Sequence, residues 1–287
     1  MKILVLGGDG MLGHQMLKVI GARHDVRVTL RQELSAYADS GLFSSENAYA
    51  GIDLRVADQI LTVMSAFHPD AVVNAAGLVK QRASATNIVA NIEVNALLPH
   101  RMALICRTTG SRFIHLSTDC VFSGTGGNYS EDDRPDPVDI YGHSKLLGEV
   151  VSEGAITLRK STIGLSLNGK TSLIDWFLSQ TETVQGYSNA IYSGITSKEL
   201  ARVIEMLLVA YPSASGLYHL SSAPISKYEL LLRLRDNLGL HIGINRDVAF
   251  CCDRSLDSTR FRDAFSYTPP SWPEMIDDLA SDIRQRQ

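Results

Sequence analysis

The stretch Ile3–Gly13, ILVLGGDGMLG, decides the fold expected for this chain. A short apolar run, Ile3–Leu6, leads directly into the spacing G-x-x-G-x-x-G, and an amphipathic segment follows. Glycines permit a tight turn and a close approach of the backbone to a pyrophosphate, and a helix N-terminus supplies free N–H groups. A plain tight turn would also explain three glycines. Their position between a strand and a helix favours a dinucleotide-binding turn that includes Gly7, Gly10 and Gly13.

Short apolar strands alternate with helical patterns through the first half of the chain. The expected strands are Ile3–Leu6, Val26–Leu30, Ala71–Ala75, Arg112–Ser117 and Ala155–Arg159. The expected helices are Met11–Ile20, Val56–Phe67, Asn91–Thr108 and Tyr141–Ser152. This alternation predicts an α/β fold with a doubly wound parallel sheet covered on both faces. Beyond residue 165 the pattern loosens, and we expect a smaller domain there, with helices at 172–180, 197–210 and 227–238.

Composition excludes several classes of protein. The 287 residues are 45% hydrophobic and carry a net charge of −4, which argues against a dedicated nucleic-acid binder and against a polybasic membrane surface. The four cysteines show no zinc-like spacing, no metal site is expected, and reduced thiols fit a cytoplasmic protein. The N-terminal apolar segment is too short for a signal sequence or a membrane span.

The ends of the next strands bear on the choice of cofactor. Arg31 follows the second strand, where arginine suits a 2′-phosphate and favours NADPH; nearby Glu33 leaves NADH as an alternative, and a solvated arginine is the other interpretation. Asp53, followed by Leu54, is expected at the end of the third strand, where it could hold an adenine amino group or cap the next helix. The small residues of Asn74–Gly77 would let a ribose and diphosphate pass close to the backbone.

Tyr141 and Lys145 are four residues apart and therefore share one face of a helix. A nearby ammonium favours the phenolate and lowers the pKa of a tyrosine toward the working range of an acid. An ordinary surface pair has the same spacing. The context favours function, because Thr118 lies at the carboxyl end of a strand, where its hydroxyl could polarise a carbonyl oxygen.

The sequence resembles the extended short-chain dehydrogenase/reductases, and within them the dTDP-4-dehydrorhamnose reductase-like group. The resemblance rests on GGDGMLG (7–13), NAAG (74–77), STDCVFSG (117–124), YSEDDRPDP (129–137), YGHSKLLGE (141–149), LRKS (158–161) and GLYHLSS (216–222). These motifs span nearly the whole chain in the order typical of the family.

The resemblance implies roles for individual residues. Tyr141 would be the proton donor, Lys145 its tuner and a ribose ligand, and Thr118 the hydroxyl on the substrate carbonyl. Asp119 and Thr162 would face the substrate. The pyrophosphate turn would comprise Gly7, Gly10, Met11, Leu12 and Gly13, and the cofactor would also be lined by Ala75, Ala76 and Gly77.

The implied activity is reduction of the 4-keto group of a nucleotide-activated 6-deoxysugar by NAD(P)H, in polysaccharide precursor biosynthesis. A Rossmann-type domain would comprise residues 1–165 and about 188–211, and a substrate domain about 166–187 and 212–287. Analogy suggests a homodimer.

Departures from the family pattern bear on the sugar and the nucleotide. Cys120 stands where the family often has tyrosine, Lys160 replaces a commoner small hydroxyl residue, and the stretches 186–200 and 253–257 differ. Arg254 could bind the diphosphate bidentately or sit in a surface salt bridge.

Other activities remain alternatives. An epimerase would need a cysteine and histidine pair, and Cys120 is one residue from the required position. Adjacent strand residues point to opposite sides, so Cys120 is not expected to substitute for the cysteine. The histidines His143 and His219 are expected on the surface or in packing. A dehydratase would use an acid at Asp119, and a non-catalytic NADP-binding regulatory subunit would keep only the fold.

Overall fold

The computed structural model describes residues 1–79, 87–169 and 172–286. The chain divides into two compact units. The first unit holds residues 1–117, 139–158 and 201–217, and the second holds 118–138, 159–200 and the residues from 218 onward. The domain limits expected from the sequence, at residue 165 and around 188–211, stay a prediction.

The first half of the chain forms strands and helices in alternation. They are β1 (Lys2–Leu6), α1 (Met11–Ile20), β2 (Asp25–Thr29), the 3₁₀ segment η1 (Leu34–Ser40), β3 (Ala48–Tyr49), α2 (Ala57–Phe67), β4 (Ala71–Asn74), α3 (Ile88–Asn91), the π-helical turn η3 (Ile92–Leu97), α4 (Leu98–Thr109), β5 (Arg112–Leu116), the 3₁₀ turn η4 (Asp119–Val121), α5 (Ile140–Leu147) and β6 (Ala155–Lys160).

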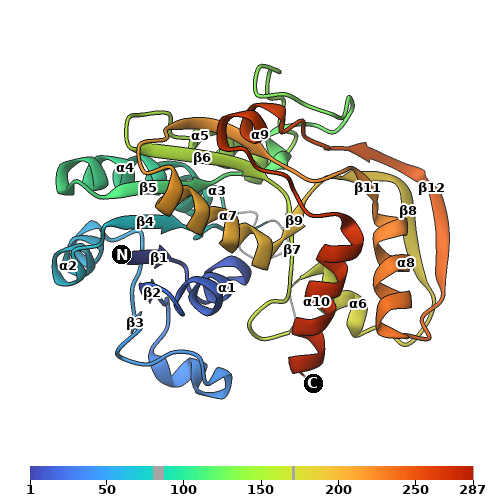
Figure 1. Cartoon of the computed structure of the whole chain (residues 1–287), viewed down its shortest axis with the longest axis horizontal. Helices are drawn as coiled ribbons and strands as arrows, with labels where there is room; N and C mark the ends of the chain where they lie inside the picture. The colour runs from blue at the N-terminus through green and yellow to red at the C-terminus, as the bar shows by residue number, and fades with distance from the viewer. Residues whose placement is uncertain (80–86, 170–171, 287) are drawn as a thin grey trace. The chain divides into compact units, whose positions relative to one another are not determined.

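The central sheet has seven strands in the order β10-β6-β5-β4-β1-β2-β3 (Figure 1). The neighbouring pairs from β3 to β6 are all parallel. The order β3-β2-β1-β4-β5-β6 is the order of a Rossmann-type sheet. In such a sheet the chain adds strands outward from β1 first toward β3 and then toward β6, so the strand order reverses between β1 and β4. The predicted doubly wound α/β fold is therefore confirmed.

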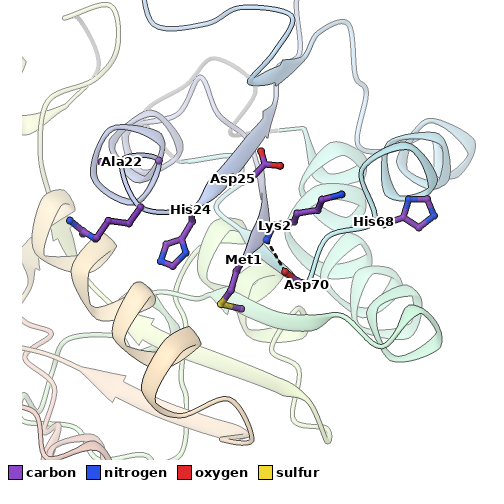
Figure 2. Close-up of a pocket in the computed structure, with 9 residues that line it drawn as sticks. Met1, Lys2, Ala22, His24, Asp25, His68 and Asp70 are labelled. Carbon is purple, nitrogen blue, oxygen red and sulfur yellow. Dashed lines mark hydrogen bonds between the residues drawn. The ribbon is translucent and has the colours of Figure 1, made fainter.

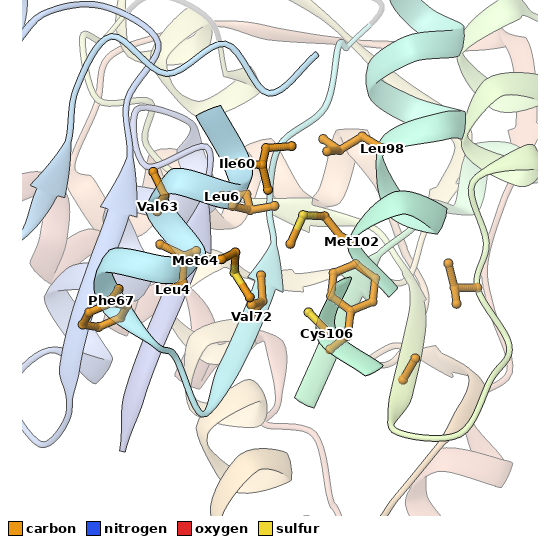
Figure 3. Close-up of a cluster of buried hydrophobic side chains, with 13 residues drawn as sticks. Leu4, Leu6, Ile60, Val63, Met64, Phe67, Val72, Leu98, Met102 and Cys106 are labelled. Atoms are coloured by element: carbon orange, nitrogen blue, oxygen red, sulfur yellow. The ribbon is translucent and has the colours of Figure 1, made fainter. Parts of the chain in front are cut away.

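A cluster of buried side chains packs one face of this sheet (Figure 3). From α2 it receives Ile60, Val63, Met64 and Phe67, whose spacing places them on one helical face. Leu4 and Leu6 of β1 join them, while the buried Ile3 and Val5 alternate to the other face. Because β1 is buried on both faces, it reads in the sequence as a continuous apolar run.

Two helices differ from their predicted limits. The helix expected at Asn91–Thr108 begins at Ile88 and contains the π-helical turn η3. The helix expected to reach Ser152 ends at Leu147, with Gly148 as its C-cap. A Cβ at Gly148 would lie 1.9 Å from the Asn95 carbonyl oxygen, so this tertiary contact selects glycine at a position that also favours helix termination.

The later part of the chain contains the remaining elements. They are β7 (Thr162–Ile163), α6 (Leu173–Leu178), β8 (Val184–Tyr192), β9 (Ile195–Thr196), α7 (Ser197–Ala210), β10 (Gly216–Leu220), β11 (Ile225–Ser226), α8 (Lys227–Leu238), β12 (Ile244–Asp253), α9 (Thr259–Phe265) and α10 (Trp272–Arg286). The order β11-β8-β12 makes a second sheet, and β7 pairs with β9.

Sequence patterning missed β8 and β12, which form most of the second sheet. Strand β12 lies at the edge of this sheet, and its side chains are largely exposed or partly exposed. An edge strand without a buried face shows no regular apolar alternation, and this removes the signal on which strand prediction depends. Across residues 1–79, 87–169 and 172–286, no helix has the length and apolar character that crossing a membrane requires.

Candidate active site

The turn after β1 is shaped by two glycines that admit no side chain. Gly7 has a φ of +83°, and a Cβ there would lie 2.9 Å from the Ala76 Cα. A Cβ at Gly13 would lie 2.1 Å from the Gly7 carbonyl oxygen. These contacts bring β1, α1 and the turn after β4 closer together than any larger residue would allow.

The N-terminus of α1 is open to a ligand. Its N-cap is Gly10, the first turn contains no acidic residue, and none of the described side chains caps it. A Cβ at Gly10 would meet a single atom within 4 Å, the Gly7 carbonyl oxygen at 3.3 Å. Space in front of free N–H groups at the positive end of a helix fits a phosphate or pyrophosphate.

A cavity of about 310 Å³ lies at this turn within the first unit. Its lining includes eight residues predicted to bind a cofactor: Gly7, Gly10, Arg31, Asp53, Leu54, Ala75, Ala76 and Gly77. Met11, Leu12 and Gly13 begin α1 beside the cavity without lining it, and Tyr141 and Lys145 are not among its lining residues. Eight other lining residues were not predicted from the sequence, namely Asp9, Thr29, Ile52, Arg55, Leu78, Asn87, Ala90 and Val94.

Asp53 and Arg55 form an ion pair in the wall of the cavity. The Arg55 guanidinium lies 2.5 Å from Asp53 Oδ2, and its hydrogen bonds hold the pKa of Asp53 below its usual range. The N-cap of α2 is Val56, so the helix-cap interpretation of Asp53 is wrong. The third strand also ends at Tyr49, four residues earlier than Asp53, because the chain turns at Gly51, with a φ of +70°.

Arg31 lies on the same cavity and is exposed. Among the described residues it has no hydrogen bond or ion pair. The pKa of nearby Tyr37 is raised, mainly by burial, and the charge of Arg31 opposes this shift only weakly. The Tyr37 hydroxyl donates to Asp9 Oδ2 at 3.1 Å. An uncommitted guanidinium at this point is suited to a phosphate monoester.

A larger hollow, of about 680 Å³, lies at the amino-terminal ends of the strands, where β1 and β2 begin (Figure 2). Met1, Lys2, His24, Asp25 and Asp70 contribute to its lining, and the backbone N–H of Lys2 donates to Asp70 Oδ2 at 2.8 Å. Ligands of doubly wound sheets bind outside the carboxyl ends of the strands. We therefore assign the site to the smaller cavity.

Helix α5 carries the predicted tyrosine and lysine. The Asp139 side chain caps it by accepting from the Gly142 N–H at 2.8 Å. Tyr141, in the first turn, is partly buried, and Lys145 is 4% exposed. Lys145 Nζ donates to the Leu116 carbonyl at 2.6 Å and lies 3.3 Å from His115 Nε2. The end of β5 thus fixes the lysine within the same unit as the cavity.

Asn95 ties α5 to the turn after β4. Its Oδ1 accepts from the Leu78 N–H at 2.9 Å, and its Nδ2 donates to the Leu78 carbonyl at 3.0 Å and to Ser144 Oγ at 3.1 Å. The residue lies in the π-helical turn η3 and is fully buried. Asn95 was not predicted from the sequence, because an asparagine inside a helical pattern does not indicate that its side chain hydrogen-bonds two other segments.

The predicted substrate residues Thr118, Asp119, Thr162 and Arg254 all belong to the second unit. Thr118 Oγ1 donates to Asp119 Oδ1 at 3.1 Å and accepts from the Cys120 N–H at 3.2 Å. Asp119–Val121 form the 3₁₀ turn η4 rather than a continued strand. The expectation that Cys120 alternates to the opposite side of a strand is therefore wrong, because strand alternation does not apply in such a turn.

Arg254 holds the segment that follows this turn. Its guanidinium donates to the carbonyls of Phe122 at 2.8 Å and Ser123 at 3.2 Å, and it lies 3.8 Å from Cys120 Sγ. These hydrogen bonds give Arg254 a structural task in addition to its predicted contact with a diphosphate.

Three further polar groups of the second unit stand out. Lys160 is the last residue of β6, and burial lowers its pKa to about 8. Electrostatic interactions with Asp119 and Cys120 raise the pKa in part but do not cancel the effect of burial. The Thr162 and Tyr192 hydroxyls are buried and have no hydrogen-bond partner among the described residues. Unpartnered buried hydroxyls are costly and suit a polar ligand such as a sugar.

The two histidines differ in their surroundings. His143 is exposed on α5, whereas His219 is fully buried. His219 Nδ1 lies 2.9 Å from the Tyr129 carbonyl, and Arg159 Nη1 lies 3.3 Å from its Nε2. Burial and the Arg159 charge lower the pKa of His219 to about 4. A histidine with this pKa is neutral near pH 7 and therefore has no readily donated proton, which weakens the epimerase alternative.

Comparisons with known proteins agree with this architecture. The spore coat polysaccharide biosynthesis protein SpsK of Bacillus subtilis is 28% identical over 85% of this chain and 81% of its own. The dTDP-4-dehydrorhamnose reductase of Aggregatibacter actinomycetemcomitans is 25% identical over 97% of this chain and 98% of its own. The crystal structure of the Bacillus anthracis dTDP-4-dehydrorhamnose reductase, in complex with NADP, superposes with a TM-score of 0.81, covers 98% of this chain and 99% of its own, and is 18% identical.

The family model for the RmlD substrate binding domain matches residues 1–246. This span contains the glycine turn, the cavity, α5 and the turn at Thr118. The chain therefore belongs to the RmlD substrate binding domain family.

Proposed function

We propose that this protein reduces the 4-keto group of a nucleotide-activated 6-deoxysugar with NADPH. The observation that carries the proposal is the combination, in one compact unit, of an open helix N-terminus beside a cavity with the tyrosine–lysine pair of α5. The dTDP-4-dehydrorhamnose reductase relative, which matches almost the full chain, supports the choice of substrate class.

The residues of the cavity fit a dinucleotide. Gly10 leaves space in front of the α1 N-terminus for a pyrophosphate, and Arg31 offers a free guanidinium to a 2′-phosphate. Asp53 and Leu54, with Ala75, Ala76 and Gly77, would complete the binding site. When bound, the nicotinamide supplies the hydride that reduces the carbonyl carbon.

The groups of the chain itself would manage the proton. Tyr141 would donate its phenolic proton to the carbonyl oxygen, and the ammonium of Lys145 would stabilise the phenolate that remains. Thr118 would polarise the same oxygen through its hydroxyl. Asp119, Thr162 and Arg254 would bind the sugar nucleotide.

The test is loss of NADPH absorbance with a panel of dTDP-, UDP- and GDP-linked 4-keto-6-deoxysugars. Turnover is expected with one of them. Removing the general acid in Tyr141→Phe should lower kcat by about 10²–10⁴-fold while the Kd for NADPH stays within about 2-fold. Tyr187→Phe, at a half-exposed position on β8, is the matched control and should keep the wild-type rate.

Absence of turnover across the panel, with NADPH still bound, would contradict the proposed substrate and favour a regulatory NADP-binding subunit. Full activity of Tyr141→Phe would contradict the assignment of the acid. A cytoplasmic location and a homodimer belong to the same proposal and would be tested by fractionation and by sedimentation.

A further inference from the structure

Four polar side chains gather within the second unit without bonding one another. They are Asp119 in the turn η4, Lys160 at the end of β6, Thr162 on β7 and Tyr192 at the end of β8. Asp119 is a shared neighbour, because its charge raises the pKa of both Lys160 and Tyr192. In the part of the chain that the structure describes, however, no hydrogen bond or ion pair joins any two of the four.

The backbone brings β7 beside the segment that follows β8. The Ile195 N–H donates to the Ser161 carbonyl at 3.2 Å, and Thr162 pairs with Ile195. A Cβ at Gly194 would lie 2.3 Å from the Tyr192 hydroxyl oxygen, so only glycine leaves room there for the phenol. Packing against the backbone therefore places the Tyr192 hydroxyl next to the segment that carries Thr162.

Each of the four side chains has hydrogen-bonding capacity that the described residues leave unused. The Thr162 and Tyr192 hydroxyls are buried and have no partner among them. Lys160 Nζ has no hydrogen bond there either, and with a pKa of about 8 it is mostly charged at neutral pH. Asp119 accepts from Thr118 Oγ1 at 3.1 Å through Oδ1, which leaves Oδ2 open. Polar groups left without partners away from water are costly, and a polar ligand would satisfy them.

The chemistry of the four groups indicates the kind of ligand. The Lys160 ammonium only donates hydrogen bonds, and Asp119 Oδ2 only accepts them. This combination suits a neutral group that both accepts and donates, such as a sugar hydroxyl, whereas Asp119 would repel an anion. One hydroxyl has a single proton and two lone pairs, so it cannot bond all four side chains. Two neighbouring hydroxyls can.

We propose that Lys160 and Tyr192 are specificity-determining residues, which together with Asp119 and Thr162 bind two neighbouring hydroxyl groups of the substrate sugar. One hydroxyl accepts from Lys160 Nζ and donates to Asp119 Oδ2. The other bonds the Thr162 and Tyr192 hydroxyls.

The proposal rests on the proposed function and narrows its substrate class. In a nucleotide-activated 4-keto-6-deoxyhexose, C2 and C3 are the neighbouring carbons that carry free hydroxyls. The substrate therefore keeps both of these hydroxyls. A sugar that lacks either one is rejected, because it leaves polar groups of the site unpaired.

The test is calorimetric titration of the NADPH-bound protein with nucleotide sugars that NADPH cannot reduce. The parent ligand is a 6-deoxyhexose with a hydroxyl at C4, linked to whichever of dTDP, UDP and GDP binds most tightly. It is compared with its analogues that lack the hydroxyl at C2 or at C3, and with the nucleoside diphosphate alone. The wild-type protein should bind the parent at least about tenfold more tightly than either deoxy analogue.

Lys160→Met removes the charged donor and keeps a side chain of similar length. The Kd of the parent should rise at least about tenfold, and its advantage over one of the two deoxy analogues should fall below about threefold. The Kd of the nucleoside diphosphate should stay within about 2-fold. Lys18→Met, at an exposed position on α1, is the matched control and should keep the wild-type values.

Tyr192→Phe removes only a hydroxyl. Because that hydroxyl has no partner among the described residues, its loss should not lower the urea midpoint of the free protein. The parent should nevertheless bind about 3–10-fold more weakly, with the loss confined to its advantage over the deoxy analogue that Lys160→Met does not affect. Tyr187→Phe, on the same strand, is the matched control for both readouts.

Three outcomes would overturn the proposal. The first is a wild-type protein that binds the deoxy analogues as tightly as the parent. The second is an unchanged Kd of the parent in Lys160→Met. The third is an unchanged Kd in Tyr192→Phe, which decides the matter even if Lys160→Met fails to fold.

Binding and turnover can fail independently. The expected pattern of Kd values without oxidation of NADPH by any keto sugar would contradict the proposed reaction and leave the assignment of Lys160 and Tyr192 intact. Turnover with equal binding of the parent and deoxy sugars would contradict the assignment and leave the reaction intact.

Discussion

At the scale of single residues, two arginines on one cavity have different freedom. Arg55 is engaged by Asp53 through its guanidinium, and it lies 3.9 Å from Glu93 as well. Arg31 is exposed and has neither a hydrogen bond nor an ion pair among the described residues. A phosphate entering the cavity would therefore meet Arg31 without first breaking an existing pair.

Replacement of Arg31 should change the preference between cofactors. In Arg31→Ala the KM for NADPH should rise by roughly 10–100-fold, because a charge-assisted hydrogen bond is worth about 1.5–3 kcal/mol. The KM for NADH, which has no 2′-phosphate, should stay within about 2-fold. Steady-state kinetics with both cofactors would measure this.

The matched control for that prediction is Arg55→Ala, which removes a guanidinium from the same cavity. We expect it to change the two KM values to a similar extent. Equal losses with NADPH and NADH in Arg31→Ala would show that Arg31 does not recognise the 2′-phosphate.

At the scale of elements, the turn between β1 and α1 separates two uses of glycine. Gly13 is required for packing, because its missing Cβ leaves room for the Gly7 carbonyl oxygen. Gly10 is not crowded by the protein, and the space beside it faces the open helix N-terminus. The sequence shows the same residue at both positions, and only the packing distinguishes them.

Alanine substitutions should separate these two uses. Gly13→Ala should reduce the free energy of unfolding by about 1–3 kcal/mol or more, because backbone atoms must shift to admit the methyl group. Gly10→Ala should change it by less than about 1 kcal/mol and yet weaken NADPH binding at least about tenfold. Urea unfolding and fluorescence titration with NADPH would measure the two effects. Equal stability losses in the two variants would contradict this division.

The limits of α5 show why element boundaries are hard to predict. The apolar pattern after Tyr141 continues beyond Leu147, so periodicity alone extends the helix to Ser152. The helix ends earlier, at Gly148, where the Asn95 carbonyl oxygen leaves no room for a side chain. Asn95 is 53 residues away in the sequence, and local periodicity contains no record of such a contact.

At the scale of the whole molecule, the chain keeps the predicted cofactor residues in one unit and the predicted substrate residues Thr118, Asp119, Thr162 and Arg254 in the other. Both tryptophans, Trp176 and Trp272, belong to the second unit. Their fluorescence therefore reports on the stability of the unit that contains His219.

The second unit should lose stability in mild acid. The pKa of His219 is lowered to about 4, so between pH 6.5 and 4 the unfolded chain binds a proton that the native chain does not. The free energy of unfolding should therefore fall as pH falls through this window, by up to roughly 3 kcal/mol. Urea unfolding followed by tryptophan fluorescence at pH 7, 6 and 5 would measure the decline.

Two variants test the origin of that decline. His219→Gln should be less stable at pH 7, because burial and hydrogen bonds are lost, but its stability should depend less on pH. His143→Gln, at an exposed position on α5, should keep the wild-type dependence. A dependence that is unchanged in His219→Gln would assign the acid sensitivity to other groups.

The sequence by itself determined the class of fold, because short buried strands and amphipathic helices have local periods that a single chain displays. It also predicted the glycine turn and the pair Tyr141 and Lys145, since each motif lies within a few consecutive residues. Only the tertiary structure decided that Arg55 pairs with Asp53, that Asn95 hydrogen-bonds Ser144 of α5, and that His115 lies between Asn74 and Lys145, within hydrogen-bonding distance of both. Most of these contacts join residues distant in the sequence, and all depend on the orientation of single hydrogen bonds, which no local pattern encodes.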